Sequence, residues 1–438
     1  MNSKLLVGVG RQDITPGIGA VLQGYAPGRP AESIHDHLNL TAYAFEYESL
    51  RSIVAAADLL LLSEPFVSEI RQAMAEASGI PFDNIIICTT HTHSGPVTRR
   101  SPGEYPVDND YLYNHLVPAA AKAAADAAAS LRPALVGIGT THSDVGINRR
   151  QINEDGSISL GQNPYGSYDP IMTVISFREP DGKPIGNMIH YGAHNTASGK
   201  NPEITRDWCG VMIDRLEELS GGITAFFNGC EGDCGPRLPS GKTTGNLQQA
   251  LELGGQAATD AVRAWCSIKE WRSDFDMRVI SGTVQMPLKK PASLPELEAE
   301  LATFEDPSAI SGLKLTHYKV VQERIEAVKS GMQFKDFSDM PISVVSVGPV
   351  AFLPIPFETF SVITLRLRKY SPFTHTLSLS NGNGSIEYFP SQDQLIRGGY
   401  EVWMFTSMKL QPYADNSEQC FVSGCTELLR KLKNNKPL

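Results

Sequence analysis

The sequence of 438 residues is poor in basic side chains and in cysteine. It has 38 Lys and Arg residues and 48 Asp and Glu residues, which gives a net charge of -10. No stretch concentrates the basic residues that neutralising a phosphate backbone requires, so nucleic acid is excluded as an expected partner. The seven cysteines are odd in number and scattered along the chain. That pattern does not fit a disulfide framework.

Long apolar runs are also missing. The strongest run, residues 53–62, is interrupted by Asp58, and a transmembrane helix needs roughly 20 apolar residues in succession. The apolar run at residues 5–9 follows the first four residues directly and is too short for the core of a secretory signal. We therefore expect a soluble cytoplasmic protein with neither an export signal nor a transmembrane segment.

Several common functional motifs fail on spacing. Gly241-Lys242-Thr243 imitates the end of a phosphate-binding P-loop, but Pro236 occupies the position of the first glycine of that loop. Gly8-Val9-Gly10 precedes no helix start, so it is not a dinucleotide fingerprint. No G-x-S-x-G elbow occurs, which leaves a serine hydrolase of the α/β type without an evident nucleophile. Cys230 and Cys234 supply only two ligands, too few for a metal site.

Short β-branched or apolar runs alternate with helical patterns along the whole chain. This alternation predicts a mixed α/β (α+β) protein. Ser63 is the expected N-cap of the first long helix. The expected strands cover residues 5–9, 40–45, 53–57, 85–88, 136–138, 171–177, 342–347, 350–353 and 376–379, and the expected helices cover residues 64–77, 111–131 and 247–267.

The interval from residue 291 to residue 331 differs from the rest of the chain. Glu and Lys are dense there, and apolar residues recur at helical spacing. We expect a helical hairpin that shapes the entrance of a pocket. The sequence has no internal repeat, low-complexity segment or flexible linker. One continuous domain over residues 1–438, with this helical excursion, is therefore predicted.

The most specific motif is Thr90-His91-Thr92-His93-Ser94-Gly95-Pro96, directly after the buried-strand pattern of residues 84–88. Residues i and i+2 of an extended backbone point to the same side, so His91 and His93 can converge beyond the end of the strand. Sites of α/β proteins are commonly built there. Metal binding or catalysis is one interpretation of the motif. Loop histidines that bond only to the backbone are the other.

Further segments place metal-ligand side chains after apolar strands. Residues 187–194 form an apolar strand that contains His190 and ends in His194, a candidate third imidazole. Glu358 also follows a predicted strand, where it is either a metal ligand or a carboxylate stabilised by the first turn of the next helix. The Gly- and Asn-rich loop of residues 381–390 follows another strand, and such loops often hold functional groups.

With these motifs the sequence resembles the neutral (non-lysosomal) ceramidase family, zinc-dependent amidases that cleave N-acyl sphingosine. The Thr-His-Thr-His-Ser-Gly-Pro run is the most specific part of the match, and the weaker parts occur in the order of the family. The resemblance implies a fold in which two β-sheets are stacked between helical layers. The weaker parts are Gly10-Arg11-Gln12-Asp13-Ile14-Thr15, Gly24-Tyr25-Ala26, Ile34-His35-Asp36, Asn148-Arg149, Asp169-Pro170, Asn228-Gly229-Cys230-Glu231-Gly232-Asp233 and Gly399-Tyr400-Glu401.

The resemblance also implies roles for individual side chains. His93 would stand beside the metal-activated water, and Arg149 and Tyr400 would point at the substrate carbonyl and the oxyanion. This set is chemically coherent, because zinc lowers the pKa of bound water toward about 7, an imidazole manages the proton, and cationic and phenolic donors stabilise the developing charge. The side chains that would bind Zn2+ are His91, His194, Glu358 and Tyr388.

The sequence departs from the family at one position that matters for mechanism. Gly235 replaces a serine to which a catalytic part is sometimes given in the family, so a mechanism through that hydroxyl is unavailable. The chain ends about 38 residues after Tyr400. We therefore expect a short member of the family that lacks the C-terminal β-domain.

These observations predict a zinc hydrolase that cleaves an amide bond of a ceramide-like lipid or a smaller N-acyl compound, by direct attack of a metal-activated water. A zinc esterase or lactonase is an alternative, because the same site would hydrolyse an ester more readily than an amide. A catalytically inert relative that binds a ligand is another, and Gly235 favours it. The expected partner is a small-molecule or lipid-like amide substrate, and a homo-oligomer is left open.

Overall fold

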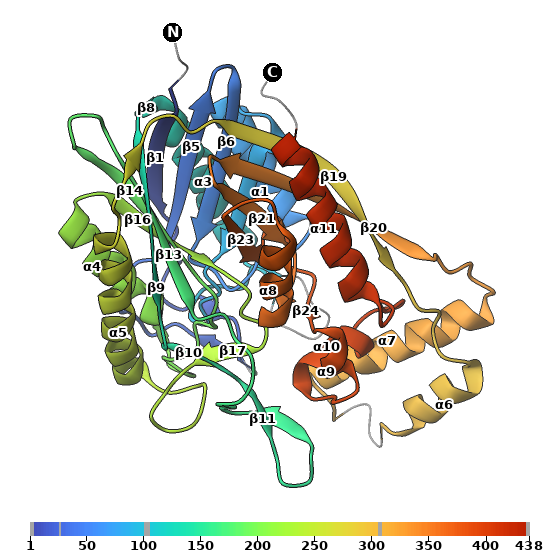
Figure 1. Cartoon of the computed structure of the whole chain (residues 1–438). Helices are drawn as coiled ribbons and strands as arrows, with labels where there is room; N and C mark the ends of the chain where they lie inside the picture. The colour runs from blue at the N-terminus through green and yellow to red at the C-terminus, as the bar shows by residue number, and fades with distance from the viewer. Residues whose placement is uncertain (1–3, 26–27, 100–105, 305–308, 435–438) are drawn as a thin grey trace.

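The computed structural model describes residues 4–25, 28–99, 106–304 and 309–434. Ala26 of the Gly24-Tyr25-Ala26 match and residues 1–3 of the N-terminal segment lie outside these ranges. The described elements stack as helices, sheet, sheets and helices (Figure 1). The predicted mixed α/β fold is therefore confirmed. One sheet layer is made of two sheets side by side, which the sequence did not indicate.

The first sheet carries the N-terminal half of the candidate site. Its strand order is β7-β6-β5-β1-β8. All its pairs are antiparallel except β6 and β7, which run parallel. Its strands are β1 (Leu6–Asp13), β5 (Asn39–Tyr47), β6 (Leu50–Ala57), β7 (Ile85–Thr89) and β8 (Arg132–Pro133).

The opposite layer is formed by a five-stranded and a four-stranded sheet, which meet at their edge strands β16 and β23. Each of these sheets contains one parallel pair, β14 with β16 and β21 with β23. The five-stranded sheet is β16 (Ile223–Asn228), β14 (Pro184–Tyr191), β13 (Ile171–Arg178), β9 (Leu135–His142) and β18 (Trp271–Arg272). The four-stranded sheet is β19 (Met277–Pro287), β20 (Phe337–Val347), β21 (Val350–Ile355) and β23 (His375–Ser380).

Alternation of side chains along the strands builds the cores on both faces of the first sheet. In β5, Ala42 and Ala44 face the outer helices, whereas Tyr43 and Phe45 face the opposite sheet layer. The small residues allow helices to lie close, and the aromatic residues fill the space between the sheets. The outer helices are α1 (Phe66–Ser78) and α3 (Val117–Ala129) on the first sheet, α4 (Trp208–Ser220) and α5 (Leu247–Cys266) on the second, and α8 (Ser361–Tyr370) and α11 (Ser417–Asn434) on the third.

Short elements connect the layers near the site. They comprise paired two- and three-residue strands and brief helices. The pairs are β2 (Val21–Leu22) with β3 (Arg29–Pro30), β4 (Ser33–Ile34) with β15 (Glu203–Ile204), β10 (Gly146–Asn148) with β17 (Cys234–Pro236), β11 (Arg150–Ile152) with β12 (Ile158–Leu160), and β22 (Glu358–Thr359) with β24 (Tyr388–Phe389). The helices are η1 (Phe82–Asn84), α2 (Asn109–Tyr111), η2 (Leu112–Leu116), α9 (Gln392–Leu395) and α10 (Tyr400–Ser407).

Two helix predictions need correction. The first long helix begins at Phe66 rather than residue 64, its N-cap is Pro65, and no side chain caps it. Ser63 was therefore the wrong N-cap, because the chain turns through the Glu64–Pro65 peptide before the helix starts. The predicted helix at residues 111–131 contains a π-helical turn, η2, between α2 and α3.

The predicted helical hairpin at residues 291–331 is present as α6 (Leu294–Ala302) and α7 (Gly312–Lys329). The two helices share a small apolar cluster around Leu297, Val321 and Ile325. Buried Arg324 of α7 donates hydrogen bonds to the Thr406 and Lys409 carbonyl oxygens, each at 3.0 Å. The hairpin is thereby fixed to the carboxyl end of α10, the helix that begins with Tyr400.

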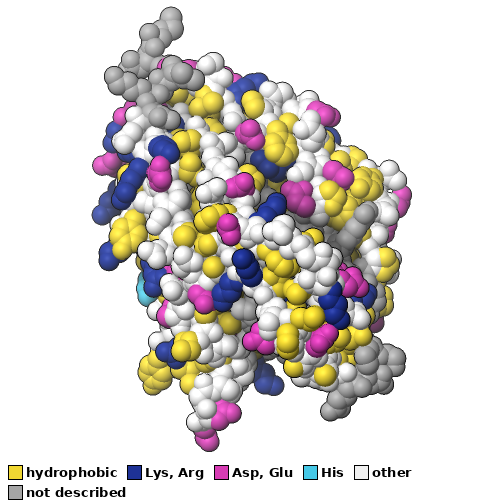
Figure 2. All heavy atoms as spheres, turned by 90° about the vertical axis from the view of Figure 1, so that its right-hand side faces the viewer, with side chains coloured by type: hydrophobic (Ala, Val, Ile, Leu, Met, Phe, Trp, Pro, Cys, Tyr) yellow, Lys and Arg dark blue, Asp and Glu magenta, His cyan; other side chains and the backbone are white. Residues whose placement is uncertain are grey.

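Surface and helix properties agree with the composition. None of the helices in the described ranges combines the length and apolar character that a bilayer crossing requires. On the face shown in Figure 2, Lys and Arg side chains are interspersed with Asp and Glu rather than gathered in one patch. This distribution offers no extended basic surface on that face.

The contact between β1 and α3 yields a test of the packing. A Cβ atom on Gly10 would lie 2.2 Å from the Ala123 carbonyl oxygen, which belongs to the helix backbone and cannot rotate away. We expect Gly10→Ala to lower the free energy of unfolding by about 1–3 kcal/mol, measured by urea denaturation. Gly17→Ala is the matched control, because a Cβ there has none of the described residues within 4 Å apart from its chain neighbours. Equal stability of the two variants would contradict this close packing.

Candidate metal centre

The motif after β7 turns sharply so that its two histidines enter the interior. His91 has a left-handed backbone with φ of 65°, and its amide N donates to the Leu59 carbonyl oxygen at 2.9 Å. The Thr90 carbonyl oxygen accepts hydrogen bonds from the side-chain amides of Asn195 and Asn228. These bonds tie the loop after the first sheet to the loops after β14 and β16.

Backbone carbonyls fix the tautomer of each imidazole. Nδ1 of His91 lies 2.9 Å from the Leu60 carbonyl oxygen, and Nδ1 of His93 lies 3.1 Å from the Gly24 carbonyl oxygen. Nδ1 of His194 lies 2.8 Å from the carbonyl oxygen of Glu231. Because a carbonyl can only accept, Nδ1 carries the hydrogen and each Nε2 presents a lone pair.

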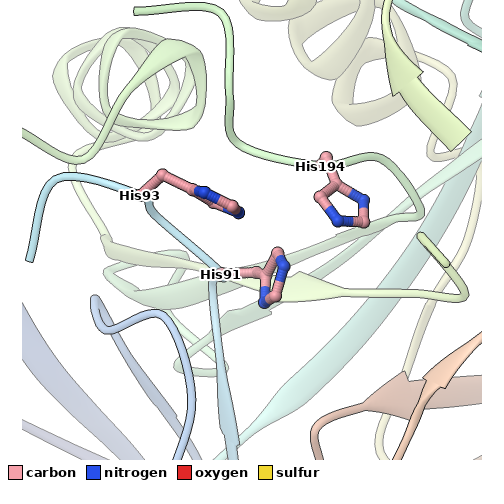
Figure 3. Close-up of side chains that lie close together, drawn as sticks. All are labelled: His91, His93 and His194. Atoms are coloured by element: carbon pink, nitrogen blue, oxygen red, sulfur yellow. The ribbon is translucent and has the colours of Figure 1, made fainter. Parts of the chain in front are cut away.

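The three imidazoles face a common space (Figure 3). The ring centroid of His91 lies 5.0 Å from that of His93 and 4.6 Å from that of His194. One nitrogen from each of the three rings lies within 4.8 Å of the others. Such spacing suits imidazoles that bind a single metal ion or lie directly beside it.

Strand pairing brings the predicted carboxylate and phenol together. Glu358 and Tyr388 are direct partners in the parallel pair of β22 and β24. Oε2 of Glu358 lies 3.4 Å from Nε2 of His91 and 3.2 Å from Nε2 of His194. The Tyr388 hydroxyl oxygen lies 3.4 Å from Nε2 of His194. Gly232 allows this approach, because a Cβ there would lie 2.4 Å from the Glu358 carbonyl oxygen.

The donor set fits a metal ion. Nε2 of His91 and Oε2 of Glu358 are buried and make no hydrogen bond among the described residues, although they face each other. Buried polar atoms without partners are rare and require an explanation. A cation accepts lone pairs from all of these atoms at once, and nitrogen with oxygen donors is a typical zinc environment.

The ionised form of Glu358 and the neutral form of His194 suit metal ligands. Burial alone would raise the pKa of Glu358, but His91 and His194 hold it well below its usual value, so the carboxylate is ionised. Burial, with Arg149 and His91, lowers the pKa of His194 to about 3. Burial and the neighbouring imidazoles also lower the pKa of His93 well below its usual value. In His91, burial lowers the pKa, but the negative charge of Glu358 outweighs burial and leaves the pKa above its usual value.

The other two predicted catalytic residues lie around Tyr388. The Arg149 guanidinium carbon is 5.3 Å from the Tyr388 ring centroid, and the Tyr400 ring centroid is 5.5 Å from it. Nη2 of Arg149 is buried without a hydrogen-bond partner among the described residues. Glu401 fixes this guanidinium, since its Oε1 accepts from Nε of Arg149 at 2.9 Å and its Oε2 accepts from Nη1 of Arg150 at 2.7 Å.

Sequence reasoning missed the roles of Glu231 and Glu401. Glu231 lies within 4.8 Å of ligand atoms of His91 and Glu358, and its Oε1 accepts from Nδ2 of Asn381 at 2.9 Å. Burial raises the pKa of Glu231 to about 8. Both glutamates belong to quoted stretches of the family match, which was the only available signal, because neither stretch has a periodic pattern.

Two other positions are resolved by the structure. His190 points away from the centre, and its Nε2 lies 3.0 Å from the Ser378 carbonyl oxygen in the joint between the second and third sheets. At the position of the family serine, a Cβ on Gly235 would lie 2.7 Å from the Thr243 Cβ. The threonine side chain thus occupies the space that a serine would need.

The sequence is similar to known ceramidases. A family model described as "Neutral/alkaline non-lysosomal ceramidase, N-terminal" matches residues 5–259. Neutral ceramidase A of Dictyostelium discoideum is 27% identical over 263 residues, which cover 54% of this chain and 36% of that protein. The match thus spans about a third of the length of this curated relative.

Solved structures share the fold. The crystal structure of neutral ceramidase from Pseudomonas aeruginosa matches with a TM-score of 0.74 and 19% identity, over 100% of this chain and 76% of that chain. A ceramidase complexed with C2 matches with a TM-score of 0.73 and 16% identity, over 99% of this chain and 76% of that chain. At these identities the likeness establishes the fold alone.

Metal binding by the imidazole Nε2 atoms is testable with a single substitution. We expect His91→Ala to lose stoichiometric zinc, because it removes one imidazole from the centre, as measured by metal analysis of the purified protein. His37→Ala is the matched control, since that imidazole pairs with Asp13 at the surface. Circular dichroism verifies that both variants are folded. Unchanged zinc content in folded His91→Ala would show that the ion binds elsewhere.

Proposed function

The chain belongs to the neutral/alkaline non-lysosomal ceramidase family, and we propose that it is a zinc-dependent hydrolase. It cleaves the amide bond of an N-acyl compound, either a ceramide-like lipid or a smaller amide. The observation that carries this proposal is the meeting of two imidazoles, a carboxylate and a phenol at one buried point. In the proposal, His91, His194, Glu358 and Tyr388 hold the ion.

Backbone carbonyl oxygens orient the two imidazole ligands. Bound zinc polarises a carbonyl group and lowers the pKa of water toward about 7, which makes a nucleophile available near neutral pH. The carbonyl oxygens of Leu60 and Glu231 hold the His91 and His194 rings through their Nδ1 atoms. Such outer hydrogen bonds set the direction and basicity of ligand imidazoles.

In the proposal, His93 transfers the proton from the attacking water to the leaving nitrogen. Its Nε2 is buried and has no hydrogen-bond partner among the described residues, and its Nδ1 is committed to the Gly24 carbonyl oxygen. Because Nδ1 donates to that carbonyl, Nε2 has a free lone pair and is able to accept a proton from the attacking water. The same nitrogen then returns the proton to the amine nitrogen as the C–N bond breaks.

In the proposal, Arg149 and Tyr400 stabilise the negative charge that develops on the carbonyl oxygen. The free Nη2 of Arg149 is a buried cationic donor, and buried donors stabilise developing charge more than donors in water do. Burial raises the pKa of Tyr400 to about 12, so its hydroxyl keeps its hydrogen and donates. Glu401 holds Arg149 in place by their ion pair.

Metal removal tests the proposal as a whole. The zinc-loaded chain is expected to hydrolyse N-acyl amines, to lose that activity after dialysis against a chelator, and to regain it when zinc is restored. Product release from a matched amide and ester of the same acyl chain separates an amidase from an esterase. A zinc-loaded protein that hydrolyses no N-acyl amide in a broad panel would refute the amidase assignment.

Tyr400→Phe tests the oxyanion assignment separately from metal binding. Removing one donor to a developing oxyanion typically lowers kcat about 100-fold to 1,000-fold, and we expect a decrease of that order with zinc content unchanged. Tyr370→Phe is the control, because that side chain is exposed at the surface. Loss of zinc in Tyr400→Phe, or full activity, would contradict the assigned role.

A further inference from the structure

The aromatic rings of the centre contact one another in a row, each ring lying next to the following one. Tyr25 contacts His93 with ring centroids 5.1 Å apart, and His93 lies 5.9 Å from His194. His194 stacks on Tyr388 at 6.4 Å, and Tyr388 contacts Tyr400 at 5.5 Å. Among the described residues no ring contact joins Tyr25 to either of these tyrosines. Tyr25 therefore adjoins His93, whereas Tyr400 adjoins Tyr388.

This order sets the direction in which an amide lies. The carbonyl oxygen belongs with Arg149 and Tyr400, the donors assigned to its negative charge. The nitrogen belongs near His93, because a general acid must be within hydrogen-bond reach of the atom that it protonates. The amine half of the substrate therefore extends toward Tyr25.

Tyr25 is held rigidly against His93. The Gly24 carbonyl oxygen accepts from Nδ1 of His93, and Gly24 has a φ of 109° that favours glycine. A Cβ on Gly24 would lie 2.4 Å from Nδ1 of His93, so only glycine lets the tyrosine approach this closely. The Tyr25 hydroxyl oxygen is buried and has no hydrogen-bond partner among the described residues.

A cation without an anion lies beside this phenol. Arg29 is 9% exposed, and its guanidinium carbon is 5.2 Å from the Tyr25 ring centroid. Its Nη2 donates to the His93 carbonyl oxygen at 2.9 Å and contacts the Ser94 hydroxyl at 3.3 Å, and its Nε donates to the Asn201 carbonyl oxygen. Its Nη1 has no partner, and no carboxylate pairs with it within the described ranges.

Within the described part of the chain, the carboxylate that acts on Tyr25 is Asp207, and it is already engaged. Oδ1 of Asp207 accepts from the backbone N of Ala197 and Trp208, and its Oδ2 accepts from the backbone N of Ser198 at 2.8 Å. Burying a charge without a partner is costly, and so is a buried polar atom without a hydrogen bond. The Arg29 guanidinium only donates, and the Tyr25 hydroxyl is able to donate as well. A ligand that accepts from both is the matching one, and an anion also balances the guanidinium.

From this arrangement we infer that the amine half of the substrate carries a carboxylate, which Tyr25 and Arg29 bind, so that the chain acts on N-acyl amino acids. This inference rests on the proposed amide hydrolysis. In the reaction, water adds to the acyl carbon, the C–N bond breaks and the nitrogen takes a proton. The products are a carboxylic acid and a free amino acid.

A series of substrates with one acyl chain tests the inference on the unaltered protein. We would compare N-dodecanoylglycine, N-dodecanoylethanolamine and N-dodecanoylpropylamine, whose amine halves end in a carboxylate, a hydroxyl and a methyl group. Hydrogen bonds to charged groups predict a kcat/KM at least about tenfold higher for the glycine conjugate. A preference for the ethanolamine or propylamine conjugate overturns the inference but leaves amide hydrolysis standing. If the zinc-loaded protein hydrolyses none of the three conjugates and no other N-acyl amide, the proposed function itself fails.

Tyr25→Phe then identifies the residue responsible. The variant removes one hydroxyl and is expected to lower kcat/KM for the glycine conjugate about tenfold or more, while kcat/KM for the propylamine conjugate changes little. Tyr165→Phe, at a side chain that is 97% exposed, is the matched control. Equal losses on both substrates with zinc content unchanged would assign Tyr25 a merely structural role and overturn the inference.

Discussion

The contact between the Glu358 carboxylate and two buried imidazoles is the constraint on which the site depends. The Nδ1 atoms of His91 and His194 are committed to backbone carbonyls, so their Nε2 lone pairs face an ionised carboxylate oxygen at 3.4 and 3.2 Å. Acceptors that face one another in a buried space are stable only with a proton or a cation between them. A metal ion relieves this conflict, and its binding would release any proton held there.

The fold meets this constraint by gathering the ends of parallel strands. β7, β14 and β21 each run parallel to a neighbour, and their carboxyl ends lead to His91, His194 and Glu358 respectively. The face-to-face stacking of the first sheet on the other two brings these loops to one place. Side-chain amides such as that of Asn228 then hold the loops together, so the ligands come from rigid elements.

Much of the fold was predictable, because local periodicity governs strands and helices. The strand before His91 and the helical hairpin after residue 291 agree with their patterns within a few residues. Ser63 failed as a cap because the chain context at Pro65 decides where the helix begins. The π-helical turn at Leu112–Leu116 and the division of one sheet layer into two sheets leave no periodic signal.

The sequence by itself determined that His91 and His93 share one loop after a buried strand, because both directly follow the apolar run of residues 85–88. The left-handed backbone of His91, rather than an extended chain, turns the two side chains into the site. The sequence also carried the family resemblance that selects Glu358 and Tyr388. Only the tertiary structure decided that Glu401 holds Arg149, that Thr243 occupies the space beside Gly235, and that Arg29 lies next to Tyr25. The contact of Glu401 with Arg149 joins residues far apart in the chain. Its geometry is set by the packing of whole elements, which no short pattern of residues encodes. The other two contacts join residues that are close in the chain, but the turns that bring them together depend on the surrounding tertiary structure.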